Sequence, residues 1–236
     1  FMTFPVILIV GQVYNGEEFW KSKMKEGGIL ALGALGASLS AALWLVYDYV
    51  DSLPNFDDQQ SVTQWLEWVS FDLLQSDYTL TSGSKILGMG VWIDSITLMI
   101  LFVATFLCFL ICWFSLGYMN TDPINEDRNH RFYGEFVLFA LGMFGMVLAD
   151  NFLWLFIFWE VMGLCSYLLI GFYYWKDSAA YASKKAFLTT RVGDVFLMIG
   201  LFILYDIYGS LEFSVIFHDP SPVSYTHLRA HETRPY

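Results

Sequence analysis

Residues 151–175 read NFLWLFIFWEVMGLCSYLLIGFYYW, a long apolar run in which Glu160 is the only charge. The hydrocarbon core of a bilayer is about 30 Å thick, and about 20 apolar residues cross it as a helix. The run is continuous rather than alternating and is too long for a strand, and irregular backbone cannot face lipid. It therefore predicts a transmembrane helix and an all-α fold.

Similar runs recur along the chain, at residues 1–14, 27–50, 91–118, 132–149 and 184–208. The first is too short to span and does not begin with Met, so we expect it to be the end of a helix that starts before this sequence. The composition agrees, with 56% hydrophobic and only 15% charged residues and a mean hydropathy of +0.50; globular chains carry about 25% charge. We predict a polytopic transmembrane helix bundle, with five full spans and a partial one.

Loop charges predict how the bundle crosses the membrane. If every run crosses once, loops 15–26, 119–131 and 173–185 lie on one side and loop 51–90 and the turn at 149–151 on the other. The first three hold Lys21, Lys23, Lys25, Arg128, Arg131, Lys176, Lys184 and Lys185; the others hold only Lys85. Basic loops stay inside, so we place this group in the cytoplasm or on the equivalent matrix or stromal side.

The turn at 149–151 must be tight. Asp150 and Asn151 separate two apolar runs, and asparagine is a favoured residue at a helix N-terminus. We predict that runs 132–149 and 151–175 form an antiparallel hairpin. For the acidic loop 51–90 two interpretations remain: an interfacial amphipathic segment around Trp65 and Trp68, or a solvated acidic surface.

Several functional classes are excluded. The net charge of −11 repels phosphate backbones, so we expect no nucleic-acid partner. Cys108, Cys112 and Cys165 all lie inside apolar runs, which favours neither a disulfide framework nor a zinc site. No motif for haem, iron–sulfur or nicotinamide binding is present, and we expect no cofactor and no metal in this chain.

The tail differs in composition from the rest of the chain. Residues 223–233 read VSYTHLRAHET, which resembles the translation of a sequencing-library adaptor. His227 and His231 have the spacing of a metal-binding pair, but nearby prolines argue against a helix there. We expect residues 223–236 to be non-native and the chain to be truncated at both ends. The remainder divides into an N-terminal part, 1–90, and the start of a functional domain, 91–222.

Glu160 is the strongest candidate for a functional residue. A charge at mid-membrane costs about 2.5–3.5 kcal/mol on insertion scales and calls for a reason. Gly163 and Tyr167 share its helix face, which leaves room for a partner helix or water. Burial disfavours a charged carboxyl and a nearby cation favours it, so a moving cation could load and unload a proton. No lysine lies at mid-membrane, so we expect that cation outside this sequence; a static structural carboxyl is the alternative.

The run 184–208 holds a second group of charges. Lys184, Arg191 and Asp194 fall on one helix face, and opposite charges at this spacing neutralise one another. A static ion pair that joins helices and an active switch are equally open interpretations. Lys185 points elsewhere, and we expect its amine to reach the interface.

Two stretches resemble a known family. VLADNFLWLFIFWEVMGLCSYLLIGFY at 147–173 and KKAFLTTRVGDVF at 184–196 are similar to chain 5, or subunit L, of respiratory complex I, the proton-pumping NADH:quinone oxidoreductase. IDSITLMIL at 93–101 and RFYGEF at 131–136 are similar too. The resemblance covers about residues 85–213.

The resemblance implies a role for each candidate residue. Glu160 aligns with a protonatable glutamate of the family's fifth helix, Arg191 and Asp194 with a charged cluster, and Lys185 with the lysine before Ala-Phe. These four would relay protons or couple charges, driven by quinone chemistry in other subunits. The family's seventh-helix lysine has no counterpart here, because the chain ends first; this fragment alone should not pump.

The family also implies the molecular setting. NADH, flavin, iron–sulfur clusters and quinone would be bound by other subunits. The partners would be other membrane subunits of complex I, especially neighbouring antiporter-like ones, together with the lipid bilayer. The expected location is the bacterial inner membrane, with the mitochondrial inner or thylakoid membrane as alternatives. A subunit of a multi-subunit sodium/proton antiporter is the second functional interpretation, and a purely structural membrane subunit is the third.

Overall fold

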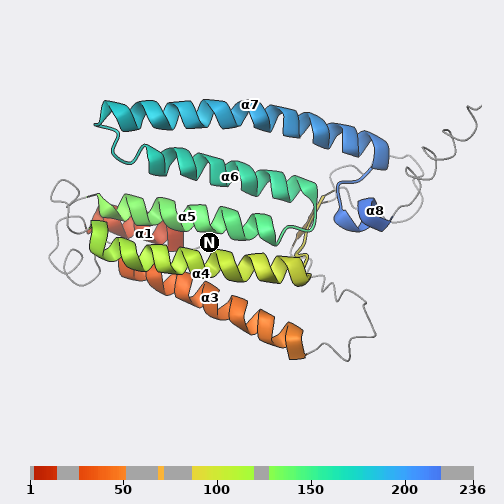
Figure 1. Cartoon of the computed structure of the whole chain (residues 1–236), viewed down its shortest axis with the longest axis horizontal. Coiled ribbons are helices and arrows are strands. Elements are labelled where there is room, and N and C mark those ends of the chain that lie inside the picture. Colours follow the sequence, from red (N-terminus) through yellow and green to blue (C-terminus); the bar gives the residue numbers. More distant parts are fainter. Residues whose placement is uncertain (1–2, 15–26, 52–68, 72–86, 120–127, 219–236) are drawn as a thin grey trace, which may run out of the picture.

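The computed structural model describes residues 3–14, 27–51, 69–71, 87–119 and 128–218. In those residues its helices are α1 (Thr3–Val13), α3 (Gly28–Asp51), α4 (Ser95–Tyr118), α5 (Asn129–Val147), α6 (Phe152–Ile170), α7 (Asp177–Tyr208) and α8 (Phe213–His218). The long helices lie side by side with their axes roughly aligned (Figure 1). The predicted all-α transmembrane bundle is confirmed.

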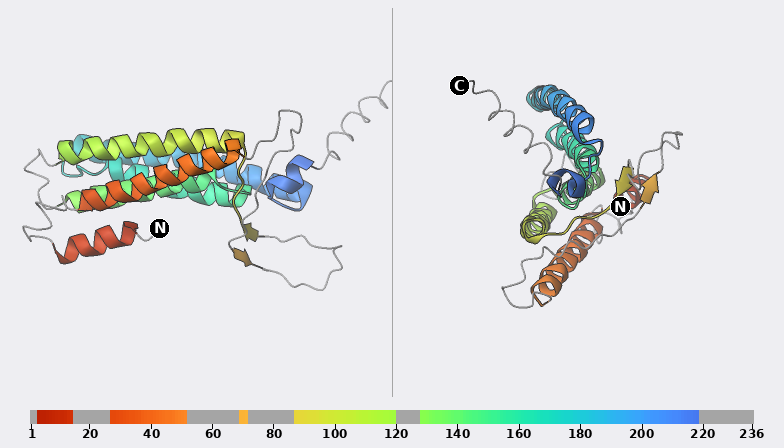
Figure 2. Two further views of the ribbon diagram at one scale, coloured as in Figure 1. Left: turned by 90° about the horizontal axis from the view of Figure 1, so that it is seen from below. Right: turned by 90° about the vertical axis from the view of Figure 1, so that its right-hand side faces the viewer.

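Helix α5 is the centre of the bundle. It packs against α1, α3 and α4 on one side and against α6 on the other, and α6 in turn packs against α7. Seen end-on, α7 and α3 lie at opposite edges (Figure 2, right). One broad face of α6 is therefore covered by α5, and another by α7.

Small residues allow the central helices to approach closely. A Cβ on Gly142 of α5 would lie only 3.1 Å from the backbone nitrogen of Met162 in α6. A Cβ on Gly28 of α3 would lie 2.7 Å from Cζ of Tyr133, a residue of α5 that is fully buried in the core shared with α3 and α4. Membrane helices use such small residues because apolar side chains gain little by leaving lipid for one another.

Side-chain caps begin two of the helices. Asn151 Oδ1 accepts a hydrogen bond of 2.8 Å from the backbone N–H of Trp154, and Asp94 Oδ1 accepts one of 2.6 Å from that of Thr97. Each cap satisfies an amide that has no partner within its helix. The first confirms the predicted tight hairpin of α5 and α6, and the second gives the charge at the start of run 91–118 a structural role.

Four of the described helices are long and apolar enough to cross a membrane: α3, α4, α6 and α7. Helix α5 has a suitable length of 19 residues but falls outside that set, and α1 has only 11 residues. Large apolar side chains are exposed on the outer faces, among them Trp44, Met99 and Phe196. Lipid is the natural environment for such a surface, which identifies a multi-pass membrane protein.

Two boundaries differ from the predictions. Helix α7 begins at Asp177, so Lys184 and Lys185 lie in the helix and not in a loop 173–185. Helix α6 ends at Ile170, before the aromatic residues that follow it. Continuous hydropathy locates only the apolar part of a helix, so it missed the polar first turns of α7.

Three short elements were not predicted. Strands β1 (Val69–Phe71) and β2 (Leu87–Met89) pair antiparallel within the acidic segment, and α8 follows α7. Three-residue strands are too short to show a clear alternating pattern. The interpretations of this segment around Trp65 and Trp68, and the tail at 223–236, lie outside the described residues.

Candidate functional site

The site forms where α6 and α7 pack antiparallel at the edge of the bundle. Ring centroids of Tyr167 and Phe187 are 5.1 Å apart, and a Cβ on Gly163 would lie 3.8 Å from Nη2 of Arg191. The glycine thus leaves space for the guanidinium to cross α6. The face of α6 that holds Gly163 and Tyr167, which was expected to leave room for a partner helix or water, therefore lies against α7.

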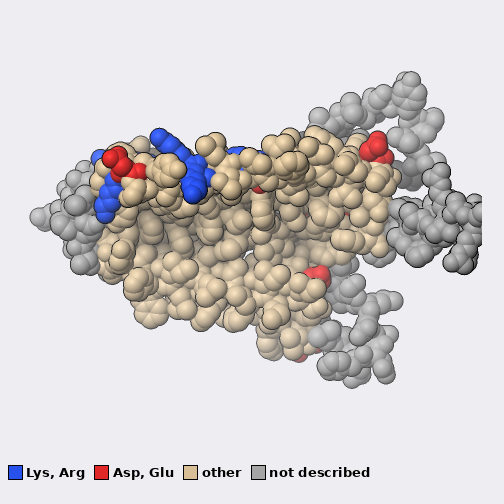
Figure 3. Space-filling view, turned by 45° about the horizontal axis from the view of Figure 1, so that its top comes forward, with Lys and Arg blue, Asp and Glu red and all other residues tan. Residues whose placement is uncertain are grey.

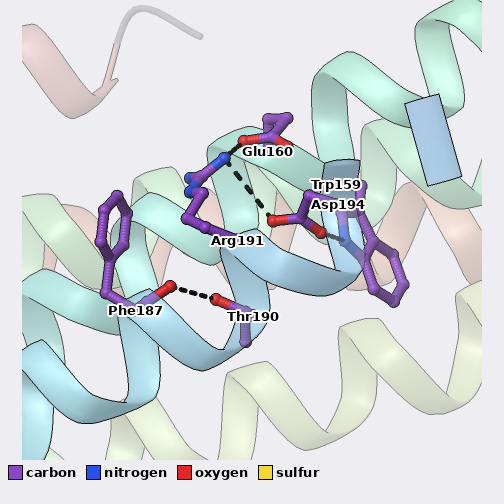
Figure 4. A network of polar contacts seen from close by, with 6 residues as sticks. All are labelled: Trp159, Glu160, Phe187, Thr190, Arg191 and Asp194. Atoms are coloured by element: carbon purple, nitrogen blue, oxygen red, sulfur yellow. Dashed lines mark hydrogen bonds and ion pairs between the residues drawn. The ribbon is translucent and has the colours of Figure 1, made fainter. Parts of the chain in front are cut away.

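Arg191 lies between two carboxylates (Figure 4). Its Nη1 forms an ion pair with Oε2 of Glu160 on α6 and lies 3.6 Å from Oδ2 of Asp194 on its own helix. The Arg191–Asp194 pair was predicted from its spacing. The Glu160–Arg191 pair was missed, because periodicity within one helix does not say which residue of another helix it meets. We call these three residues the charged triad.

The remaining contacts orient the charged triad. Trp159 Nε1 donates a hydrogen bond of 2.9 Å to Oδ1 of Asp194, so the two oxygens of that carboxylate serve different partners. The guanidinium carbon of Arg191 lies 4.6 Å from the ring centroid of Phe187. A cation over an aromatic face is attracted by the ring quadrupole. Trp159, which no sequence motif singled out, therefore positions Asp194.

The triad is partly open. The exposed fractions of the side chains are 25% for Glu160, 30% for Arg191 and 13% for Asp194. A hollow of about 140 Å³ lies beside it between α6 and α7, and hydroxyl-bearing residues contribute to its wall: Ser166, Tyr167 and Thr190. Such a wall supplies donors and acceptors for water next to Asp194.

On the face drawn in Figure 3 the Lys and Arg side chains lie along the upper edge, and most of the surface below them is uncharged. Lys185, like Lys184, is exposed near the start of α7, and no ion pair of either is found among the described residues. The structure thus brings together three of the four predicted site residues and leaves Lys185 apart from them. In the described ranges no group of three His, Cys, Asp or Glu side chains is placed to hold a metal ion.

The ion-paired triad lies between two antiparallel helices that are each long and apolar enough to cross a membrane, and the family models place the chain among antiporter-like membrane subunits. Residues 80–133 match the family model described as NADH-ubiquinone oxidoreductase (complex I), chain 5 N-terminus. Residues 149–226 match the one described as NADH:quinone oxidoreductase/Mrp antiporter, TM. The chain belongs to the complex I chain 5, or subunit L, family of antiporter-like subunits.

Curated relatives agree with this assignment. NAD(P)H-quinone oxidoreductase chain 5 of Synechocystis sp. is 37% identical over 188 residues, which cover 80% of this chain and 24% of the relative. NADH-quinone oxidoreductase subunit L of Pseudomonas aeruginosa is 36% identical over 184 residues, which cover 78% of this chain and 27% of the relative. The chain therefore spans about a quarter of the length of these relatives.

Solved structures support the fold. A chain of the membrane-bound sulfane sulfur reductase, an archaeal respiratory membrane complex, superposes with a TM-score of 0.66 at 17% identity. The match covers 89% of this chain and 36% of that chain. A chain of the Mrp complex from Dietzia sp. superposes with a TM-score of 0.63 at 18% identity. The match covers 93% of this chain and 21% of that chain. The helical fold is thus shared with chains of these two membrane complexes.

Proposed function

We propose that this chain is part of the proton-translocating membrane subunit of an NADH:quinone oxidoreductase. The observation that carries the proposal is Arg191 shared between Glu160 and Asp194. The names of the relatives supply the reaction, the oxidation of NADH by quinone. We place the electron transfer, and the flavin, iron–sulfur clusters and quinone that it needs, in other subunits. Neighbouring antiporter-like subunits and lipid are the partners of this one, and the bacterial inner membrane is its location.

The triad can couple charge movement to proton binding. At 3.6 Å and an effective dielectric of 20, a unit charge pair is worth about 5 kcal/mol. While Arg191 stays beside Glu160, the carboxylate is held ionised; when the guanidinium turns toward Asp194, Glu160 loses its cation and accepts a proton. The reverse movement releases that proton. Lys185 near the start of α7 adds positive charge at the basic end of the bundle.

A Glu160→Gln variant tests this function. It would be made in the full-length subunit, assembled in its complex and placed in sealed vesicles, with proton uptake and NADH oxidation measured together. We expect proton uptake per NADH to fall, since the amide keeps the shape but cannot ionise. Asp206→Asn, which removes an exposed carboxylate of α7 far from the triad, is the control. Unchanged coupling in Glu160→Gln contradicts the proposal.

Sodium/proton antiport is the second candidate, because one matching family model and one matching structure include Mrp antiporters. The same vesicles distinguish the two functions. Proton uptake that needs NADH and is indifferent to sodium supports the oxidoreductase. Proton movement that is driven by a sodium gradient without NADH supports the antiporter.

A further inference from the structure

Glu135 is a buried carboxyl that the charged triad does not include. It lies on α5 with an exposed fraction of 7%, and its Oε2 has no hydrogen-bond partner among the described residues. Its other oxygen, Oε1, lies 3.6 Å from Nη2 of Arg131, one turn earlier on the same helix. An acidic group buried in this way is costly, so its presence calls for a function.

The surroundings of Glu135 contain few other charges. Cys165 of α6 is close enough to interact with it electrostatically. Helices α1 and α4 carry no charged residue, and the acids of α3, Asp48 and Asp51, lie at the end of that helix away from Gly28. Arg131 is the cation that the structure pairs with Glu135, and His130, buried on the same helix, is a further titratable group.

The position of Glu135 links the basic end to the triad. Gly142 of α5 faces Phe158 and Met162 of antiparallel α6, so Glu135, seven residues earlier, lies about 10 Å nearer the end at which α5 begins. Arg131, half-exposed at 49%, lies at that end. The order along the bundle axis is thus an exposed cation, a buried carboxyl, and then Glu160 with Arg191.

We propose that Glu135 is a second proton-binding carboxyl, which takes a proton at the basic end of the bundle and passes it toward the charged triad. Binding forms one O–H bond at Oε2 and neutralises the carboxylate. Release breaks that bond and restores a negative charge, which Arg131 stabilises. Arg131 attracts the carboxylate without a hydrogen bond at 3.6 Å, so the free oxygen remains available to a proton. The inference rests on the proposed function.

Infrared difference spectroscopy and transport test it together. The full-length subunit in its complex would carry Glu135→Gln, Glu160→Gln or the control Asp206→Asn. A pH change should produce a carboxylic-acid C=O band that is absent in Glu135→Gln and present in Glu160→Gln. NADH-driven proton uptake in Glu135→Gln should fall at least about tenfold, because a positioned relay group contributes about 10²–10⁴ in rate.

Two outcomes would overturn the inference. A purely structural Glu135 would let the isosteric glutamine sustain uptake at the wild-type rate. A C=O band that survives in Glu135→Gln would show that Glu135 does not titrate. Either result leaves the proposed function untouched, because that function is decided by Glu160→Gln; Glu135→Asp, which keeps an acid, should restore part of the uptake and separates lost chemistry from misfolding.

Discussion

At the scale of single residues, Gly163 determines how far the guanidinium of Arg191 can move. Nothing but Nη2 of Arg191 lies within 4 Å of the position where its Cβ would be. The φ of Gly163 is not positive, so the backbone does not require glycine there, and its contribution is the empty space on α6. A side chain there competes directly with the guanidinium for the same volume.

Gly163→Leu is predicted to displace Arg191 from Glu160 and to reduce proton uptake per NADH as strongly as Glu160→Gln does. Gly163→Ala should be nearly neutral, since its Cβ would make only an ordinary contact of 3.8 Å. Proton uptake in vesicles is the measurement. Gly193→Leu on α7, where no atom lies within 4 Å, is the matched control, and equal losses in both leucine variants would refute the spatial argument.

At the scale of elements, the α5–α6 hairpin depends on Asn151. Its side chain caps α6 through Oδ1, and its Nδ2 donates a hydrogen bond of 2.8 Å to Oδ1 of Asp150. The two residues of the turn therefore hold each other in place. The turn is also bonded on its other side, where the N–H of Phe213 donates to the carbonyl of Asp150. The hairpin and α8 are thus joined by a hydrogen bond at Asp150.

Asn151→Ala should lower the free energy of unfolding by about 1 kcal/mol, the usual effect of a lost N-cap. The measurement is thermal unfolding of the purified complex in detergent, followed by the reactivity of its buried cysteines. Asn151→Asp keeps an accepting oxygen and should recover most of the loss. A midpoint that does not change in Asn151→Ala would mean that other contacts hold the turn.

The apolar runs predicted the helices because a membrane helix must be continuously hydrophobic, and the cap at Asn151 followed from residue type. The start of α7 was placed seven residues too late, because Asp177 and Ser178 are polar although helical. The Glu160–Arg191 contact and the Trp159–Asp194 hydrogen bond each join α6 to α7. Both depend on the register between helices, which one sequence does not state.

At the scale of the whole molecule, the basic residues that the structure describes, apart from Arg191, lie toward one end of the bundle. Helices α4 and α6 finish there, and α5 and α7 begin there, as alternating crossings require (Figure 1). Cys108, Cys112 and Cys165 are buried in its interior, with exposed fractions of 3%, 0% and 0%. The native thiols should therefore give little background in a labelling experiment.

Asp177→Cys at the start of α7 and Asp206→Cys near its end are predicted to react with a membrane-impermeant maleimide from opposite sides. In sealed vesicles with the cytoplasmic face outward, only Asp177→Cys should be labelled; opening the vesicles with detergent should expose Asp206→Cys. The readout is a mass shift on a gel. Labelling of both positions in intact vesicles would contradict the predicted orientation.

The length of α7 has a further consequence. Its 32 residues make a helix about 48 Å long, well beyond a hydrocarbon core of about 30 Å. A tilt alone would have to exceed the usual range of about 0–40°, so part of α7 projects among the lipid headgroups. Lys184 lies about 10 Å along the axis from Arg191. The Debye length is about 8 Å at an ionic strength of 0.15 M. Added salt should therefore screen the charges of Lys184 and Lys185, while the attraction within the charged triad persists.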